Sequence, residues 1–477
     1  MVNLHRSTRP TATRDTLVLL TDPRQLKDVA MDAADRRYLA SRLQGEDSFA
    51  VSDAQGRLVM VHRVKAGDRQ RQLELARRAG SDMADRLNAA KATEAQLIGL
   101  ANDPALSLSL AEGVALASYT FRKYKSNGAK KHDLEKLHVI DPAVDAEDLE
   151  ELNILCSATC TARDLVNEPV SFLTAPQLSA ELRTLGKACG FQVQVLDKRQ
   201  IEALGMGGLL AVNKGSIDPP TFNVLEWKPK KPLNKAPVVL IGKGVVYDTG
   251  GLSLKPTPHS MDYMKCDMAG AAAVAGAFAA IAQLELPLHV VGLIPATDNR
   301  PGGNAFAPGD VIRMHSGATV EVMNSDAEGR MILADALSYA ERYKPEVVVT
   351  IATLTGAAAR AIGTQGSVIM GTAPDNVMAA WETAGAAVHE RLARMPFWEE
   401  YDSEIDSDIA DMKNLGGDLA GQITAGKFLA RFTTHPFVHL DIAGTAFLHK
   451  REHYRLKGGT GVGVRLFLRY LKNLASR

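Results

Sequence analysis

The chain has 477 residues, more than the roughly 250–300 at which a single hydrophobic core stops growing, so two domains are expected. Its 55 basic and 55 acidic residues cancel, which leaves no overall field that would attract nucleic acid or an anionic membrane. Hydrophobic residues make up 46% and charged residues 23%, as in ordinary globular proteins, so the chain is expected to fold throughout. A helix that spans a membrane needs about 18 consecutive apolar residues, and the sequence is expected to contain no such stretch.

Residues 1–145 are predicted to form a small N-terminal α/β domain. Short apolar runs predict strands, and two longer stretches with apolar residues at helical spacing predict helices. Residues 1–14 are basic and rich in hydroxyl side chains, a composition also found in organelle transit peptides. The predicted strands are Thr16–Leu20, Phe49–Ser52, Leu58–Val64 and 137–141, and the predicted helices are Gln70–Ala90 and Leu108–Lys123.

A connecting helix is predicted at Ala146–Val166, and prolines interrupt the chain after it, so residues 146–170 are assigned as a connecting helix and linker. In residues 171–477, the second and larger domain, apolar strands alternate with helices. This alternation is typical of an α/β fold with a mostly parallel, mixed sheet covered by helices on both faces. The predicted strands are 191–196, 237–242, 289–294, 346–353, 367–371 and 438–444, and the predicted helices are Met268–Gln283, Met331–Tyr343 and Ala379–Leu392.

The cysteines are few for a chain of this length and form no CxxC pair of the kind found in zinc modules. Reduced thiols in a cytoplasmic protein therefore fit the sequence best. The four cysteines are Cys156, Cys160, Cys189 and Cys266.

A first cluster of polar residues lies in IGKGVVYDTGGLSLK, residues 241–255, which contains Lys243, Asp248 and Lys255. The four glycines predict a loop directly after a strand. Phosphate binding is a rival interpretation, but neither GxxxxGK[ST] nor GxGxxG is present. A tight turn with solvated charges is the other alternative.

Two further clusters place carboxylates before predicted helices. Asp267 precedes a helix of small residues, and Asp326 and Glu328 lie in NSDAEGR at 324–330. In an extended segment, residues i and i+2 point to the same side, so Asp326 and Glu328 are expected to converge. Two carboxylates held together require a cation or a proton between them. The alternative is that each acid is an ordinary helix cap or a partner of the helix dipole.

Taken together, Asp248, Asp267, Asp326 and Glu328 each lie at a predicted strand-to-helix junction, and therefore at one edge of a sheet. Oxygen ligands suit Mg²⁺, Mn²⁺ or Zn²⁺, and bridging carboxylates suit a site with two metal ions that generates hydroxide near neutral pH. The histidine-ligated HExxH proteases are excluded because that motif is absent.

These motifs resemble those of the leucyl aminopeptidase family, also called cytosol aminopeptidases. NSDAEGR resembles the family's NTDAEGR with Ser325 in place of threonine, and GKGVVYDTGGLSLK resembles its GKGxxFDSGGxxxK. IATLTGAA from Ile351, ITAGKFLARF from Ile423 and HLDIAGTA from His439 resemble further blocks. The resemblance covers residues 160–477. It implies that residues 171–477 are the catalytic domain of a metallo-aminopeptidase acting on short peptides with a free N-terminus.

The resemblance also implies a role for each matching residue. Lys255 would polarise the scissile carbonyl, and Arg330 would hold a bicarbonate ion that relays protons. One metal would be bound by Lys243, Asp248, Asp267 and Glu328, and the other by Asp248, Asp326 and Glu328. The substrate pocket would be lined by Met264, Thr353, Leu354 and Gly356, although core and turn packing is an ordinary alternative for these residues.

The sequence departs from the family pattern in two places. The loop between Lys255 and Asp267 holds one additional residue. In the segment from Ala296, Asp298 stands where a glutamate is usual and one additional residue is present. The family assembles as homohexamers, so a homohexamer is expected here. The alternative function is a scaffold or a DNA-binding regulator, for which the basic runs Arg69–Arg78 and Arg122–Lys131 are the candidate surfaces. Because these runs are better explained as solvated helix faces or loops, no nucleic-acid partner is expected.

Overall fold

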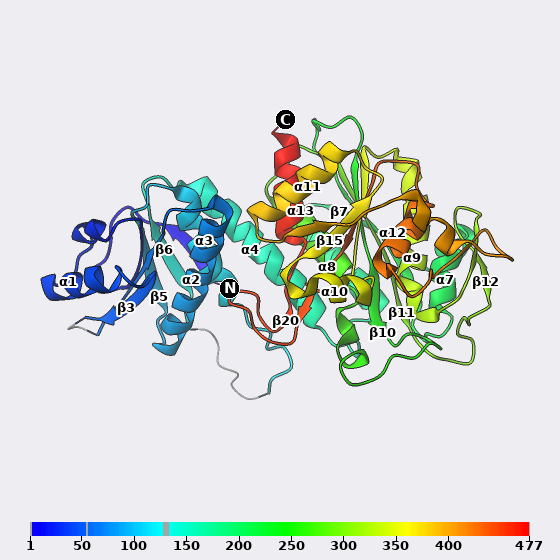
Figure 1. Ribbon diagram of the computed structural model, residues 1–477, viewed down its shortest axis with the longest axis horizontal. Helices are drawn as coiled ribbons and strands as arrows, with labels where there is room; N and C mark the ends of the chain where they lie inside the picture. The colour runs from blue at the N-terminus through cyan, green and yellow to red at the C-terminus, as the bar shows by residue number, and fades with distance from the viewer. Residues whose placement is uncertain (1, 54–55, 127–132, 477) are drawn as a thin grey trace. The chain divides into compact units, whose positions relative to one another are not determined.

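The computed structural model describes residues 2–53, 56–126 and 133–476, which form two compact units (Figure 1). Unit 1 comprises Met1–Cys160 and His449–Lys457, and unit 2 comprises Thr161–Leu448 and Gly458–Arg477. The chain passes from one unit to the other within α4 (Ala146–Asn167), the helix predicted at Ala146–Val166. The expected α/β class, with a smaller first part and a larger second part, is confirmed.

Unit 1 is built on a six-stranded sheet in the order β1-β6-β5-β2-β4-β3, parallel except for β3. Successive residues of β2 face opposite sides, so Leu17 and Leu19 pack with α2 and α3 while Val18 and Leu20 pack with α1. The elements are β1 (Asn3–Arg6), β2 (Asp15–Leu20), η1 (Pro23–Asp28), α1 (Ala33–Arg42), β3 (Ser48–Ser52), β4 (Leu58–Arg63), α2 (Arg69–Ala89), β5 (Glu94–Gly99), α3 (Pro104–Ala117) and β6 (Lys136–Ile140).

The prediction for unit 1 was incomplete. Residues 3–6 form strand β1 beside β6, and neither this strand nor β5 and α1 was predicted. The predicted helix Leu108–Lys123 begins and ends too late, because Asp103 caps the observed helix α3 and Pro104 starts it. The basic run Arg69–Arg78 forms the first half of α2, and part of the run Arg122–Lys131 lies outside the described residues.

Unit 2 is built on a nine-stranded mixed sheet, in which β9, β10, β11, β14 and β18 run parallel. β8 runs antiparallel to β11, and β15 runs antiparallel to β18. The order is β16-β15-β18-β14-β9-β11-β8-β7, with β10 beside β11. The strands of this sheet are β7 (Gln192–Leu196), β8 (Thr221–Trp227), β9 (Val238–Gly242), β10 (Gly244–Asp248), β11 (Val290–Asn299), β14 (Val347–Ala352), β15 (Ser367–Gly371), β16 (Leu392–Arg394) and β18 (Phe437–Asp441).

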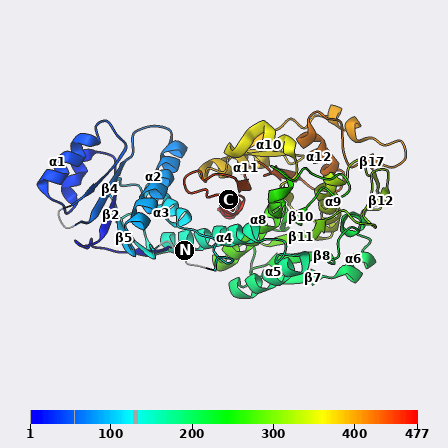
Figure 2. The same ribbon diagram turned by 90° about the horizontal axis from the view of Figure 1, so that it is seen from below.

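Helices cover both faces of this sheet, as predicted (Figures 1 and 2). α8 packs on one face together with α5 and α13, and α9 packs on the other with α7 and α12. The helices are α5 (Ala175–Cys189), α6 (Lys198–Ala203), α7 (Gly207–Asn213), η2 (Met261–Cys266), α8 (Ala269–Gln283), η3 (Ser325–Ala327), α9 (Glu328–Ala340), η4 (Glu341–Tyr343), α10 (Gly356–Ile362), η5 (Gly363–Gln365), α11 (Asp375–Ala387), η6 (Glu399–Tyr401), η7 (Ser403–Ile405), α12 (Gly421–Ala430) and α13 (Val464–Ala475), and the remaining short strands are β12 (Val311–Arg313), β13 (Thr319–Glu321), β17 (Met412–Lys413), β19 (Phe447–Leu448) and β20 (Gly458–Gly459).

The helical segment Met261–Gln283 is long and apolar enough to cross a membrane, which the sequence analysis did not expect of any segment. Its apolar window is 94% buried inside the protein, because α8 lies between the sheet and the helices α5 and α13. Its high hydropathy is therefore accounted for by its position in the core.

Three local predictions in unit 2 were wrong. The glycine-rich segment 241–255 is not a loop throughout, because Gly244–Asp248 forms β10 beside β11. Asp326 and Glu328 do not lie in an extended segment: Asp326 is in η3 and Glu328 is the first residue of α9. The helix predicted at Ala379–Leu392 begins earlier, as α11, and Leu392 belongs to β16.

Candidate metal centre

Polar residues lie at or directly after the carboxyl ends of four parallel strands of unit 2, at one edge of the sheet. Lys243 directly follows β9, and Asp248 is the last residue of β10. Asn299 is the last residue of β11, and Thr353 follows β14. Because these strands pair in parallel register, their carboxyl ends lie side by side.

Lys243 is buried at the centre of this edge. Its Nζ lies 2.8 Å from Asp267 Oδ2 and 2.8 Å from Glu328 Oε1, and it donates a hydrogen bond of 3.1 Å to the carbonyl of Thr353. Asp267 immediately follows η2, ahead of α8, and Glu328 opens α9. Lys243 therefore connects the amino ends of helices that pack on opposite faces of the sheet.

Glycines permit this close approach. A Cβ atom on Gly270, in the first turn of α8, would lie 2.1 Å from the carbonyl oxygen of Ile351. A Cβ on Gly329, in the first turn of α9, would lie 2.5 Å from Cε and 2.6 Å from Nζ of Lys243. Larger residues at these positions would displace either the helix or the Lys243 side chain.

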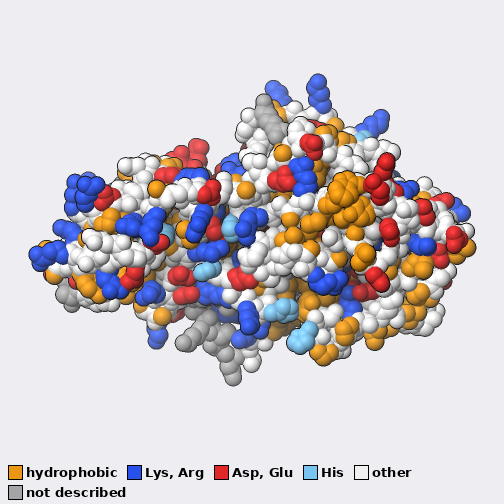
Figure 3. Space-filling view, viewed as in Figure 1, with side chains coloured by type: hydrophobic (Ala, Val, Ile, Leu, Met, Phe, Trp, Pro, Cys, Tyr) orange, Lys and Arg blue, Asp and Glu red, His pale blue; other side chains and the backbone are white. Residues whose placement is uncertain are grey.

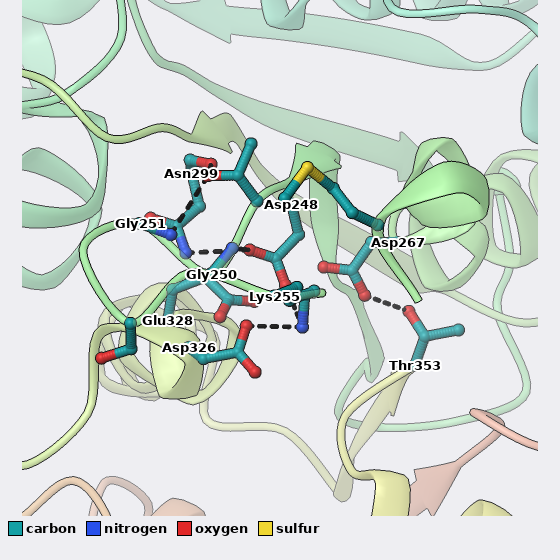
Figure 4. Close-up of polar contacts among 12 residues, drawn as sticks. Asp248, Gly250, Gly251, Lys255, Asp267, Asn299, Asp326, Glu328 and Thr353 are labelled. Carbon is teal, nitrogen blue, oxygen red and sulfur yellow. Dashed lines mark hydrogen bonds and ion pairs between the residues drawn. The ribbon is translucent and has the colours of Figure 1, made fainter. Parts of the chain in front are cut away.

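Lys255 lies within the acidic cluster, beside Asp248 and Asp326 (Figure 4). Its Nζ is 2.9 Å from Asp248 Oδ2 and 2.5 Å from Asp326 Oδ1. The intervening loop turns at Gly250 and Gly251, whose φ values of 84° and 62° are rarely adopted by other residues. Because the glycine-rich segment reverses direction, Lys255 lies beside Asp248, the last residue of β10.

Ser325 fixes this loop to the segment that carries the other acids. Its Oγ donates a hydrogen bond of 2.7 Å to the carbonyl of Gly250 and accepts one of 2.8 Å from the backbone N–H of Ser253. Both bonds require only a hydroxyl group, which serine shares with the threonine usual in the resembling motif.

Three of the predicted metal ligands are arranged so that one cation could contact all of them. Asp248, Asp326 and Glu328 each offer an oxygen, and these oxygens lie within 4.8 Å of one another. Among the described residues, the buried Glu328 Oε2 has no hydrogen-bond partner. An oxygen-rich set with a buried oxygen left over fits a divalent cation.

The carboxyl groups show strongly perturbed acidity. Burial, followed by the neighbouring carboxylates, raises the pKa of Asp326 to about 7. Burial likewise raises the pKa of Asp267 and that of Glu328. Burial alone would lower the pKa of Lys243, but the surrounding carboxylates outweigh it and the pKa is raised. The same holds for the pKa of Lys255. Four acids facing two ammonium groups leave an excess of negative charge that attracts cations.

The structure adds Asn299 and Asp441, which the sequence analysis did not identify, and a supporting contact made by Thr353. Asn299 Nδ2 donates to Asp248 Oδ1 at 2.9 Å, and Thr353 Oγ1 donates to Asp267 Oδ1 at 2.8 Å. Asp441, the last residue of β18, accepts hydrogen bonds from the backbone N–H of Leu354 at 3.2 Å and from Thr355 Oγ1 at 2.7 Å. Asn299 and Asp441 end strands at this same edge, which is the signal that could have identified them.

Arg330 lies in the first turn of α9 and is buried. Its Nη1 donates a hydrogen bond of 2.8 Å to the carbonyl of Asn414, whereas its Nε is buried with no hydrogen-bond partner in the described chain. Burial lowers the pKa of Arg330 to about 10, so it remains a cation at neutral pH. A buried guanidinium with a spare donor at a helix N-terminus is suited to an anion.

The remaining predicted residues lie on two segments beside the cluster. Met264 is half-buried in η2, and Thr353 and Leu354 are half-buried in the turn after β14. Gly356 is exposed at the start of α10. Thr353 contacts the acidic cluster through both its hydroxyl and its carbonyl group.

The two departures from the motif pattern are accommodated locally. The additional residue between Lys255 and Asp267 lies in a segment that ends with η2, and Asp267 still directly precedes α8. Asp298 Oδ2 accepts a hydrogen bond of 2.8 Å from Arg300 Nε.

Comparison with known proteins places this site in context. Residues 160–468 match the profile described as "Cytosol aminopeptidase family, catalytic domain". A probable cytosol aminopeptidase of Geobacter sulfurreducens is 46% identical over 375 residues, 77% of this chain and 75% of that protein. One of Chlorobium limicola is 47% identical over 376 residues, 76% of this chain and 74% of that protein. Among solved structures, the bottromycin maturation enzyme BotP in complex with Mn is similar at a TM-score of 0.86 and 31% identity, covering 97% of this chain and 100% of that chain.

Proposed function

Because the chain belongs to the cytosol aminopeptidase family and is therefore a metal-dependent aminopeptidase, we propose that it removes the N-terminal residue of short peptides with two divalent metal ions. The ions would supply a bridging hydroxide as nucleophile near neutral pH. Mn²⁺ is the first choice, since the similar BotP was solved with Mn, and Zn²⁺ and Mg²⁺ are the alternatives for such ligands.

We assign the ligands from the acidic cluster. Lys243, Asp248, Asp267 and Glu328 would hold one ion, and Asp248, Asp326 and Glu328 the other. Asp248 and Glu328, both buried, would contribute to both sites. Lys243 can ligate only as a neutral amine, and positive charge beside its Nζ would favour loss of its proton.

Lys255 is the residue assigned to the scissile carbonyl. Its Nζ lies beside Asp248 and Asp326, so a peptide carbonyl directed at these acids would meet the ammonium group. A fixed positive charge there would stabilise the oxyanion that develops as the carbonyl is attacked. In the metal-free protein the pKa of Lys255 is raised by the surrounding carboxylates, which favours the charged ammonium group.

Arg330 is the residue assigned to a bicarbonate ion. The unpartnered Nε, the positive charge and the start of α9 together favour a small anion close to Glu328. A bicarbonate held there would accept the proton of the attacking nucleophile and pass it to the departing amine.

The substrate would be oriented by its free α-amine at the metal centre, which restricts the reaction to chain ends. Met264, Thr353, Leu354 and Gly356 are proposed to line the pocket for the first side chain. The assignment is best supported for Thr353 and Leu354, because the turn that holds them is hydrogen-bonded to Asp267 and Asp441.

The single observation that supports this function most directly is the convergence of Asp248, Asp326 and Glu328 beside two lysines. The test is release of free amino acids from unblocked peptides by the Mn²⁺-loaded protein. Turnover should be lost with a chelator and with N-acetylated peptides. Activity that resists the chelator, or no activity with Mn²⁺ or Zn²⁺, would reject the proposal.

Substitution of Lys255 distinguishes a role in the reaction from a role in metal binding. Lys255→Ala should abolish turnover while bound metal, measured by elemental analysis, remains close to that of the wild type. Lys187→Ala, which replaces an exposed lysine on α5, is the matched control and should leave turnover unchanged. Loss of metal in the Lys255 variant would instead reassign this lysine to metal binding.

We further propose that the protein is cytoplasmic and forms a homohexamer, as the family resemblance implies. Sedimentation analysis should give a mass about six times the chain mass of 51.3 kDa. A monomer at micromolar concentration would exclude the hexamer without affecting the assignment of the active site.

A further inference from the structure

Asn414 is a fully buried polar residue that directly follows β17. Its backbone N–H donates a hydrogen bond of 2.9 Å to the carbonyl of Glu321, which extends the parallel pairing of β17 with β13 by one residue. β13 ends at Glu321, and the chain then continues into η3 and α9. Asn414 therefore lies where the chain enters the segment that carries Asp326 and Glu328.

The side-chain amide of Asn414 pairs with the backbone beyond the end of β13. Its Oδ1 accepts hydrogen bonds of 2.8 Å from the backbone N–H of Met323 and 3.4 Å from that of Asn324, and its Nδ2 donates one of 2.8 Å to the carbonyl of Asn324. A primary amide can do this because it offers an acceptor and donors in one plane. Asn324 Oδ1 in turn accepts a hydrogen bond of 2.7 Å from the backbone N–H of Asp326. Hydrogen bonds thus connect Asn414 to the backbone of a proposed metal ligand.

The backbone carbonyl of Asn414 holds the other end of the same segment, because it accepts the hydrogen bond of 2.8 Å from Arg330 Nη1. A neutral carbonyl fixes the guanidinium group without pairing off its positive charge, as a carboxylate would. One residue therefore contacts both ends of Met323–Arg330, and Asp326 and Glu328 lie between these contacts.

The strand before Asn414 is itself fixed to β13. Asp411 Oδ2 accepts hydrogen bonds of 2.7 Å from the backbone N–H of Thr319 and 3.0 Å from Thr319 Oγ1. Ser407 Oγ donates a hydrogen bond of 2.5 Å to Glu321 Oε2. Because these contacts lie outside the acidic cluster, they hold Asn414 in place whether or not the cluster contains cations.

We propose that Asn414 is a positioning residue of the metal centre. It holds Met323–Arg330 in the conformation that presents Asp326 and Glu328 to the metal ions and Arg330 to an anion. This role rests on the proposed function, which assigns those residues to metal and anion binding. Residues that orient metal ligands through hydrogen bonds typically contribute about 10–100-fold to metal affinity or activity.

The first test is Asn414→Ala. Mn²⁺ binding, measured by titration calorimetry, should weaken at least about tenfold. With saturating Mn²⁺, kcat should fall more than KM rises, and the bicarbonate concentration that gives half-maximal activity should increase. A lower melting temperature with the Mn²⁺ affinity, kcat and bicarbonate dependence of the wild type would mean that Asn414 is only structural, and overturns the proposal.

Asp411→Ala is the matched control. It removes two hydrogen bonds to Thr319 from the same three-stranded sheet, at an exposed position three residues before Asn414. Figure 3 shows several acidic side chains on the surface of unit 2 near β12, so the loss of one carboxylate changes the charge there little. This variant should melt at a lower temperature but keep the Mn²⁺ affinity and kcat of the wild type. Equal losses in both variants would assign the effect to general loosening of the sheet and overturn the proposal.

Hydrogen exchange of the metal-free wild type tests the contacts themselves, even if Asn414→Ala does not fold. The N–H groups of Met323 and Asn324 should be protected, because Asn414 Oδ1 accepts their hydrogen bonds. Exchange of both groups at the rate of the unfolded chain overturns the proposal. A wild type that neither binds Mn²⁺ nor releases amino acids would reject the proposed function, whereas a normal wild type with an equally active Asn414→Ala variant would reject only the positioning role.

Discussion

Gly329 provides the space that the Lys243 side chain occupies. For Gly329→Ala, the new Cβ would lie 2.5 Å from Lys243 Cε, so this side chain must move away from Asp267 and Glu328. We expect Mn²⁺ affinity and kcat/KM to fall about 10–100-fold, as is usual when a metal ligand loses its support. Without metal the variant should also be less stable, because two buried carboxylates lose their ammonium partner and the helix propensity of alanine offsets only part of that cost.

The control for this prediction is Gly303→Ala, a position where a Cβ would meet nothing within 4 Å. Metal titration and kinetics of both variants check it. A Gly329→Ala protein with normal Mn²⁺ affinity would show that Lys243 can adjust without loss, and would weaken its assignment as a ligand.

Asp441 is expected to act as a positioning residue. It holds the turn Thr353–Thr355, which in turn contacts Lys243 and Asp267. Asp441→Ala leaves the half-buried backbone N–H of Leu354 and the buried hydroxyl of Thr355 without their acceptor, and the buried group alone costs about 1–3 kcal/mol in the free energy of unfolding. We expect kcat/KM to fall at least about tenfold.

The conservative variant distinguishes positioning from general destabilisation. Asp441→Asn keeps one acceptor oxygen for the backbone N–H of Leu354, so it should recover most of the kcat/KM lost in the alanine variant. If both variants have normal kcat/KM and differ only in melting temperature, Asp441 is merely structural.

The difference between the predicted and the unpredicted residues has a physical reason. Lys243, Asp248, Asp326 and Glu328 lie in short motifs, and the motifs indicated that they converge. The support given by Asp441 depends on a hydrogen bond between residues 87 positions apart, which no local pattern reveals. The block HLDIAGTA contains Asp441 but does not reveal its partner, and strand ends that meet at one sheet edge would have been the guide to that contact.

At the scale of secondary structure, long apolar strands such as β9 and β14 were predicted because continuous burial leaves a clear pattern. β10 was not predicted, because Gly244 lies in a strand only through pairing with β11, where a Cβ would lie 2.5 Å from the carbonyl oxygen of Pro295. The convergence of Asp326 and Glu328 was expected for the wrong reason, since a 3₁₀ turn entering α9 brings them together. Tertiary contacts decided both segments.

Strand β4 should become unstable in acid because of His62. Burial lowers its folded-state pKa to about 4, below the ordinary 6.5, so protonation favours the unfolded state. The contribution to stability is fully present above pH 6.5 and is lost as the pH falls toward 4, by roughly 3 kcal/mol. Peptides covering Leu58–Arg63 should therefore lose protection against hydrogen exchange across this range, measured as the exchange rate relative to that of the unfolded chain at the same pH.

His62→Asn should remove most of this pH dependence, because asparagine can still hydrogen-bond to Ser48 without gaining a charge. His5→Asn, at an exposed position of the same unit, serves as the control and should behave like the wild type. An unchanged acid response in His62→Asn would mean that other groups of unit 1 titrate in its place.

At the scale of the whole molecule, the stability of unit 2 is tied to the charge at one edge of its sheet. Four carboxylates, three of them buried, face only two ammonium groups. Without bound cations the folded state therefore holds excess negative charge at this edge, which lowers its stability. Asp326 relieves part of this by protonation, because its pKa of about 7 lets it bind a proton near neutral pH. Cations that bind the folded state only must therefore stabilise it.

Mn²⁺ at one hundred times its dissociation constant should stabilise the fold by about 2.7 kcal/mol, which for a unit of this size raises the melting temperature by about 4 °C. Calorimetry with Mn²⁺ and with a chelator measures the difference. Asp326→Asn removes a charge, so in the chelator this variant should melt at or above the wild type, whereas in Mn²⁺ it should gain less. If the variant melts well below the wild type in the chelator, the Asp326 carboxylate does not destabilise the metal-free fold. If Mn²⁺ raises the melting temperature of the variant as much as that of the wild type, Asp326 does not contribute to cation binding.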